Sequence, residues 1–436
     1  MAPAIGDALA LPCGATLKNR LAKAAMTEGL ADAANRATGR HVTLYRRWAE
    51  GGAGLLITGN VQVDRRYLER AGNIAIEKPA AGAELERLAA LAAAGTTGGA
   101  GLWMQISHAG RQTPKLITAE PVAPSPVGLE IPGGRFGAPR ALSDDEIRDV
   151  IGRFGHAAAV AKETGFTGVQ VHGAHGYLLS EFLSPRVNRR SDAWGGSVAN
   201  RAQLLVECVR AARRAVGADY PVAVKLNSAD FQQGGFSFDD CLAVIELLND
   251  EGIDLLEISG GTYEQPKLLG IEGLEPAFEE RVRESTRLRE AYFLDYAAAA
   301  RGVAKMPLMI TGGFRSAAAM DEALASGAAD VIGIARPLCL DPAAPGDLLA
   351  GRTGALPDVD RALRFGSGLL GPHSRVPLVK VVNGFAKIGW YYEQIYRLAD
   401  GLDADLALGM LRALVAYERT EKTKARELER PARPGG

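Results

Sequence analysis

The sequence predicts an α/β protein in which eight strand–helix units close into a barrel, followed by a C-terminal helical extension. Eight short runs are apolar almost without interruption, as expected of parallel strands that are covered on both faces. Segments with helical periodicity lie between most of these runs. Long connections leave from the carboxyl ends of three predicted strands, at 108–142, 174–199 and 262–289. In barrels that end carries the chemistry.

The predicted strands share a length of six to eight residues and are bounded by Gly or polar residues. In chain order they are RLAKAAM (20–26), GLLITGNV (54–61), GLWMQIS (101–107), GVQVHG (168–173), VAVKLN (222–227), LLEISGG (255–261), LMITGG (308–313) and VIGIAR (331–336). Eight units with this spacing favour a closed (β/α)8 TIM barrel over an open, doubly wound sheet.

The helices are predicted from capping signals and from a period of 3.6 residues. Ser143 and Glu146 form a capping box, which begins a helix that reaches about Lys162. Similar patterns predict further helices at about 200–215, 239–250, 290–304 and 316–326.

The βα alternation stops near residue 350. We therefore predict a barrel domain over 1–350, and a helical extension over 351–436 that packs on it. Helical patterns there cover 361–373, 384–401 and 406–430. Trp390, Tyr391 and Tyr392 lie at helical spacing, which is typical of packing, although they could also cover a pocket.

Composition excludes several classes of protein. Hydrophobic residues make up 47% of the chain and charged residues 23%, which excludes a disordered protein. The 50 Lys and Arg balance 51 Asp and Glu, so we expect no nucleic-acid or membrane partner but a small-molecule one. No long apolar segment or basic leader is present, which predicts a cytoplasmic location. Whether the chain forms a homo-oligomer stays open.

Four cysteines are far apart in the sequence and lack metal-ligand spacing. Cys13, Cys208, Cys241 and Cys339 are therefore expected to be reduced and structural, and no metal site is predicted.

The segment GVQVHGAHGY (168–177) contains the strongest candidate for chemistry. It places His172, His175 and Tyr177 where a buried strand opens into a loop. A lone histidine at a strand end is more often structural, but two imidazoles and a phenol in one turn form a cluster of hydrogen-bond donors. Such a cluster suits the binding and protonation of a polarised, oxygen-containing substrate.

A phosphate site is predicted at the last two strands. Gly312 and Gly313 precede a helix that starts at Ser316, and Arg336 follows the eighth strand. Either feature alone is weak, but barrels commonly bind phosphate with these two loops and a helix N-terminus.

With these residues in view, the chain resembles the Old Yellow Enzyme family of FMN-dependent NAD(P)H:flavin oxidoreductases, the ene-reductases. The resemblance covers about residues 8–345, and its most specific motif is VHGAHGYLLSEFLSPRVNRRSDAWGGS (171–197). LKNRLAKAAMT (17–27), MQISHAGRQ (104–112), ITGGFRS (310–316) and VIGIARPLCLDP (331–342) also match.

The resemblance implies roles for single residues. It implies that His172 and His175 bind the carbonyl oxygen of the substrate and that Tyr177 is the proton donor. The residues that it implies for flavin binding are Ala25, Met26, Thr27, Asn60, Gln105 and Lys225 around the ring, and Gly312, Gly313, Ala335 and Arg336 around the phosphate.

Three positions depart from the family pattern. Lys225 stands where many members have Arg, which keeps the charge but loses the planar guanidinium. Asn60 replaces a more usual Gly or Ala. Gly29 lies near the position where one subgroup has an active-site Tyr, so the chain lacks that aromatic group there.

The resemblance implies an enzyme that takes hydride from NADH or NADPH and reduces the activated C=C bond of α,β-unsaturated carbonyl or nitro compounds. Two alternatives stay open at this point. One is an FMN barrel that oxidises or demethylates an amine. The other is a non-redox lyase or isomerase that binds a phosphorylated substrate and uses Lys225 as its amine.

Overall fold

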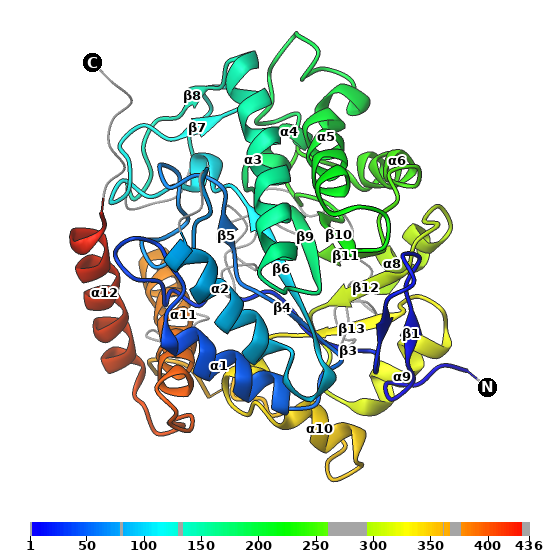
Figure 1. The fold of residues 1–436 in the computed structure, drawn as a ribbon. Coiled ribbons are helices and arrows are strands. Elements are labelled where there is room, and N and C mark those ends of the chain that lie inside the picture. Colours follow the sequence, from blue (N-terminus) through cyan, green and yellow to red (C-terminus); the bar gives the residue numbers. More distant parts are fainter. Residues whose placement is uncertain are drawn as a thin grey trace.

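A computed structural model describes residues 2–78, 82–129, 134–259, 294–360, 362–366 and 376–429. Element labels follow Figure 1. In the described chain, eight parallel strands form a ring in the order β3, β4, β6, β9, β10, β11, β12 and β13. β13 pairs with β3 and β4 pairs with β6, which closes the ring. The predicted (β/α)8 barrel is therefore confirmed.

Each barrel strand lies within one of the eight predicted runs. The strands are β3 (Leu21–Lys23), β4 (Leu55–Ile57), β6 (Gly101–Ser107), β9 (Gly168–Gly173), β10 (Val222–Asn227), β11 (Leu255–Ser259), β12 (Leu308–Thr311) and β13 (Val331–Ile334). Short strands outside the ring are β1 (Leu9–Ala10), β2 (Thr16–Leu17), β5 (Val61–Gln62), β7 (Val122–Ala123) and β8 (Arg140–Ala141).

The helices surround the ring (Figure 1). They are α1 (Gly39–Glu50), α2 (Gly82–Gly95), α3 (Asp144–Glu163), α4 (Leu178–Leu183), α5 (Val198–Val216), α6 (Phe238–Leu248), α8 (Leu294–Arg301), α9 (Ala317–Ala325), α10 (Ala344–Leu349), α11 (Pro377–Ala399) and α12 (Met410–Glu427). The Ser143–Glu146 capping box at the start of α3 is present as predicted. Short 3₁₀ helices cover Thr97–Gly99, Gly110–Gln112 and Arg336–Cys339.

Our sequence analysis did not assign α1 and α2. The capping box of α1 joins Thr38 to His41 rather than to a carboxylate or amide, so the usual signal is missing. α2 is rich in alanine and buries Leu88 and Leu91. Both helices follow barrel strands, and they complete the α/β alternation in the first third of the chain.

Side chains on each strand alternate between the helical layer and the interior of the barrel. On β6, Leu102 and Met104 belong to the main core, whereas Trp103 belongs to a second cluster inside the ring. That second cluster also contains Leu9 and Leu17 of the N-terminal β1–β2 hairpin. The hairpin therefore seals the end of the barrel where the strands begin, which leaves the carboxyl end for ligands.

The C-terminal helices α11 and α12 pack on each other, and α11 also contacts α1 (Figure 1). Trp390 is 1% exposed and donates from Nε1 to the Leu408 carbonyl, so it packs the extension. Residues 362–366 are not helical, and the rest of the helical pattern at 361–373 lies outside the described residues. The division into domains at residue 350 stays a prediction.

Candidate functional site

A layer of polar side chains lies inside the barrel, next to its carboxyl end. Alternation along the strands directs Gln105, Gln170, Lys225 and Glu257 inward, since Trp103, Ala223 and Leu255 two residues earlier belong to the interior cluster. All four polar side chains are buried. Buried polar groups are costly without partners, so their hydrogen bonds define the layer.

The layer is a continuous network centred on a carboxylate. Gln105 Nε2 donates to Gln170 Oε1 at 2.7 Å, and Gln170 Nε2 donates to Glu257 Oε2 at 2.8 Å. The Lys225 ammonium pairs with Glu257 Oε1 at 2.8 Å, and the Thr311 hydroxyl donates to the same oxygen at 2.7 Å. The charge of Lys225 is therefore balanced by Glu257 within the layer.

Sequence analysis had assigned Gln105 and Lys225 to the site but had missed Gln170 and Glu257. The available signal was one polar residue at an inward-facing position of an otherwise apolar strand, in GVQVHG and in LLEIS. A fully buried carboxylate needs a cationic partner, which made Glu257 a candidate for pairing with a strand lysine.

The structure brings His172, His175 and Tyr177 together at the end of β9. The centroid of the His172 ring lies 5.1 Å from that of the His175 ring and 5.0 Å from that of the Tyr177 ring, and both pairs are edge-to-face. His175 has a φ of +64°, an unusual backbone conformation for a residue with a side chain, and Tyr177 immediately precedes α4. The loop therefore turns sharply enough to bring three ring side chains to one place.

Neighbouring strands fix His175. Its backbone N–H donates to Asn227 Oδ1 at 3.0 Å, and its Nε2 lies 2.7 Å from Ser259 Oγ. Its carbonyl accepts a hydrogen bond from Gln112 Nε2 at 2.7 Å. Asn227, Ser259 and Gln112 are positioning residues that the sequence analysis did not name.

Both imidazoles are neutral at neutral pH. Burial, together with the nearby His175 and Lys225, holds the pKa of His172 well below its usual value. Burial and Lys225 do the same to the pKa of His175. The Ala174 N–H donates to His172 Nδ1 at 3.2 Å, so Nδ1 is an acceptor and Nε2 carries the proton. His172 is thus a neutral hydrogen-bond donor.

The low pKa values predict a loss of stability in mild acid. The unfolded chain binds protons on these histidines below about pH 6.5 while the folded chain does not, so stability falls as the pH falls. Between about pH 7.5 and about pH 5.5, each should contribute a loss on the order of 1 kcal/mol in the free energy of unfolding. Urea unfolding at the two pH values measures this change in the free energy of unfolding.

The matched comparison is the His172→Ala/His175→Ala variant. Its stability should depend on pH less steeply than that of the wild type, because the two groups no longer take up protons on unfolding. Equal pH dependence in both proteins would contradict the assignment of two buried neutral imidazoles.

The residues expected beside the flavin ring follow the ends of β3 and β4. Thr27 Oγ1 and Asn60 Nδ2 both donate to Glu69 Oε2, at 2.8 and 2.7 Å. Ala25 packs against the interior cluster, and the Met26 sulfur lies 3.7 Å from the Cys339 sulfur. The Glu69 carboxylate thus accepts hydrogen bonds from both Thr27 and Asn60 and holds them close together. The contacts of these residues with flavin stay predictions.

The structure also shows what lies against Gly29. A Cβ atom at Gly29 would lie 3.2 Å from the Tyr396 hydroxyl of α11. Tyr396 is 7% exposed. The side chain of Tyr396 from the extension therefore approaches Gly29, the position near which one subgroup of the family has an active-site Tyr.

The predicted phosphate end has the expected backbone. Gly312 and Gly313 have φ values of +116° and +84°, which favour glycine. Ser316 caps α9 by accepting from the Ala319 N–H, and Ala335 immediately precedes the 3₁₀ helix that begins with Arg336. The Arg336 guanidinium pairs with Asp360 Oδ2 at 2.5 Å.

These residues have the chemistry that FMN requires. Lys225 and Gln105 supply a cation and an amide inside the barrel mouth, and the buried Asn60 Oδ1 atom has no hydrogen-bond partner among the described residues. Arg336 and the two glycines suit a phosphate group. The set therefore fits the chemistry of flavin mononucleotide, with Lys225 and Gln105 suited to its ring and Arg336 to its phosphate.

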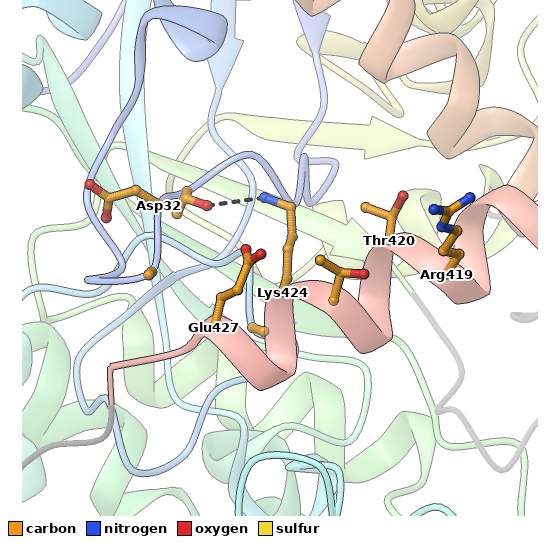
Figure 2. A pocket seen from close by; sticks show the side chains of 9 residues that line it. Asp32, Arg419, Thr420, Lys424 and Glu427 are labelled. Carbon is orange, nitrogen blue, oxygen red and sulfur yellow. Dashed lines mark hydrogen bonds between the residues drawn. The ribbon is translucent and has the colours of Figure 1, made fainter.

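A cavity of about 480 Å³ lies elsewhere, between α12 and residues 31–33 (Figure 2). Asp32, Arg419, Lys424 and Glu427 line it, and Lys424 Nζ donates to the Ala31 carbonyl at 3.0 Å. None of the predicted site residues lines this cavity. Its lining has both positive and negative side chains, and we do not assign the active site to this cavity.

The remaining polar residues of the long motif hold the loop in place. Asn188 Nδ2 donates to the carbonyls of Phe182 and Trp194, and Arg190 pairs with Asp192 at 2.5 Å. Arg201 Nε donates to the Leu183 carbonyl. These contacts show that the four side chains serve structure.

The described part of the chain contains no group of three or more potential metal ligands, and the four cysteines are free thiols. Among the same residues, no helix is both long enough and apolar enough to cross a membrane.

A flavin-dependent oxidoreductase built on a (β/α)8 barrel is the class of protein that this fold and site define. The model of the NADH:flavin oxidoreductase / NADH oxidase family matches residues 13–353, and the chain belongs to that family, the Old Yellow Enzyme family. It is an enzyme that uses FMN and a nicotinamide hydride donor.

Fungal and bacterial relatives agree with this assignment. The chain is 38% identical over 356 residues to the NADH-dependent flavin oxidoreductase iliE of Hypocrea jecorina, covering 77% of this chain and 86% of the relative. It is 39% identical over 361 residues to a protein of the same description from a Neonectria species, covering 78% of this chain but only 46% of that protein. The NADPH dehydrogenase of a Geobacillus species is 30% identical, over 76% and 89% of the two chains.

Solved structures confirm the fold. The Old Yellow Enzyme homologue of Zymomonas mobilis has a TM-score of 0.68 at 24% identity, over 87% of this chain and 98% of that one. A 2-naphthoyl-CoA reductase has a TM-score of 0.71 at 26% identity, over 80% and 52% of the two chains. Membership of this family excludes the alternative of a non-redox lyase or isomerase.

Proposed function

We propose that this enzyme reduces the activated C=C bond of α,β-unsaturated carbonyl or nitro compounds, with hydride from NADH or NADPH. The observation that carries the proposal is the contact of two neutral imidazoles with one phenol above the polar layer of the barrel. When bound, FMN supplies the transfer of hydride between the nicotinamide and the acceptor.

The histidines would bind the acceptor oxygen. Protonated Nε2 of His172 would donate one hydrogen bond to the carbonyl or nitro oxygen. His175 would donate a second from Nδ1, with the Ser259 hydroxyl donating to its Nε2. These bonds strengthen as negative charge develops on that oxygen during attack at the β carbon. Because the positioning residues already fix the His175 loop, little reorganisation is needed at that moment.

Tyr177 would supply the proton. Its hydroxyl transfers a proton to the α carbon of the acceptor, which completes the saturated product. The side chain is 3% exposed and its ring contacts His172, so the proton would be delivered from within the same cluster that binds the oxygen.

The polar layer below would tune the site electrostatically. Lys225 stabilises negative charge near the mouth, while Glu257 offsets part of that effect at 2.8 Å. The remaining flavin contacts proposed are those of Ala25, Met26, Thr27, Asn60 and Gln105 around the ring and of Gly312, Gly313, Ala335 and Arg336 around the phosphate. A small-molecule acceptor is the proposed partner, a cytoplasmic location stays a prediction, and the oligomeric state stays open.

An anaerobic titration of the holoenzyme tests the reaction class. NADH or NADPH should bleach the flavin absorbance, and cyclohexenone should restore it in a separate, later addition. Restoration by the enone supports the proposal. If an amine bleaches the flavin while neither nicotinamide does, or if the enone leaves the reduced flavin unchanged, the proposal is wrong.

A further inference from the structure

Four side chains from three parts of the chain converge on Asp360. Arg336 Nη1 lies 2.5 Å from Oδ2, and Lys387 Nζ lies 3.3 Å from Oδ1. The Tyr391 hydroxyl donates to Oδ1 at 2.5 Å, and Arg315 Nη2 lies 3.5 Å from Oδ2. Arg315 and Arg336 follow β12 and β13, whereas Lys387 and Tyr391 lie one turn apart on α11. The barrel mouth and the extension therefore share one charged cluster.

Among the described residues, the cluster joins three cations to two carboxylates. Three cations face Asp360 and one further acid, Asp358, which lies 3.4 Å from Arg315 Nε. The side chains of Asp360 and Lys387 are only 17% and 14% exposed, so solvent screens these charges weakly. Burial acts to raise the pKa of the Asp360 carboxyl, but Arg336, Tyr391 and Lys387 outweigh it and hold that pKa below its usual value. Asp360 is therefore ionised, and it holds the three cations around one point.

The location of these cations indicates which anion they would bind. Arg315 comes two residues after Gly313, and Arg336 is the arginine proposed to bind the FMN phosphate. Arg336 is 46% exposed on its side chain, so part of its guanidinium can still meet a ligand. A phosphate monoester is a dianion, and it binds best where several cations converge.

We propose that helix α11 completes the phosphate subsite of FMN, with Lys387 as a phosphate-binding residue supplied by the extension. Asp360 is a positioning residue in this arrangement, since it holds Lys387, Arg315 and Arg336 around one point. Lys387 lies beyond residues 13–353 that the family model covers, so the extension adds a cofactor contact to the shared barrel. The proposal rests on the proposed location of the phosphate at Arg336.

The test compares FMN with riboflavin, which lacks the phosphate. Flavin is removed from the full chain, and the dissociation constants of both flavins are measured by quenching of flavin fluorescence. Lys387→Met should raise the constant for FMN by about tenfold or more, since a contact between charged groups has at least that effect. The constant for riboflavin should change by less than about twofold, and Lys387→Arg should keep most of the affinity for FMN.

Controls separate this inference from the phosphate site itself. Lys305→Met removes an exposed lysine whose partner is Asp250, and it should change neither constant. If Arg336→Met weakens FMN selectively but Lys387→Met does not, the extension makes no contribution and the phosphate site stands. If neither variant distinguishes FMN from riboflavin, both proposals are wrong. Thermal melting of each flavin-free variant by circular dichroism identifies loss of folding, and Lys387→Arg then decides the case.

Discussion

Tyr177→Phe is expected to keep the flavin bound and reducible by NADH or NADPH, but to slow reoxidation by an enone by about 10²–10⁴-fold. The reason is that the phenol donates the proton to the α carbon, and phenylalanine has no proton to give. Stopped-flow measurement of the two half-reactions separates the effects. The reductive rate should stay within about twofold of the wild type, because Tyr177 has no role in that half-reaction.

Tyr220→Phe is the matched control for this substitution. Tyr220 lies just before β10, and its hydroxyl donates to the carbonyl of Phe166, just before β9. Both residues lie where the strands begin, at the end of the barrel opposite the proposed site. Loss of the Tyr220 hydroxyl should cost about 1 kcal/mol of stability and leave both half-reactions unchanged. An oxidative rate in Tyr177→Phe equal to that of the wild type would remove Tyr177 from its proposed role.

The His172→Ala/His175→Ala variant is expected to bind phenols far more weakly than the wild type. A phenol bound as its anion would accept hydrogen bonds from both imidazoles, and a hydrogen bond to a charged group is worth about 1.5–3 kcal/mol. Loss of both donors should therefore raise the dissociation constant of p-hydroxybenzaldehyde by at least about 100-fold. The charge-transfer absorbance of the phenol–flavin complex measures it.

His156→Ala serves as the control for the double variant. His156 lies on α3 in the helical layer, where its Nε2 is 3.2 Å from the Glu77 carbonyl, so it is remote from the proposed oxygen site. Its substitution should leave phenol affinity within about twofold of the wild type, since no donor to the ligand is lost. Unchanged phenol affinity in the double variant would show that the imidazoles do not bind the acceptor oxygen.

Local sequence patterns predicted the barrel strands and the central cluster. A parallel strand covered on both faces must be apolar throughout, so each strand was visible in its own six to eight residues. His172, His175 and Tyr177 were found for a similar reason, because one turn after β9 contains all three. Helix α1 was missed since His41, rather than a carboxylate, closes its capping box.

Contacts across the barrel could not be predicted in the same way. Gln105, Gln170, Lys225 and Glu257 come from four different strands, and no pattern within one strand shows that their polar ends meet. The pairing of Lys225 with Glu257 matters for the site because it moderates the one cation expected beside the flavin. Nor did the sequence show that Asp360 faces Arg336 and Lys387, since these residues lie on separate elements.

By itself the sequence determined the fold class, the family and the identity of the ring side chains at the end of β9, because hydrophobic periodicity and compact motifs are local properties of the chain. Only the tertiary structure decided which charges are balanced, which imidazoles are neutral and where the extension meets the barrel. Those properties depend on burial and on distances between residues far apart in the chain, which only the folded arrangement of the strands and helices brings about.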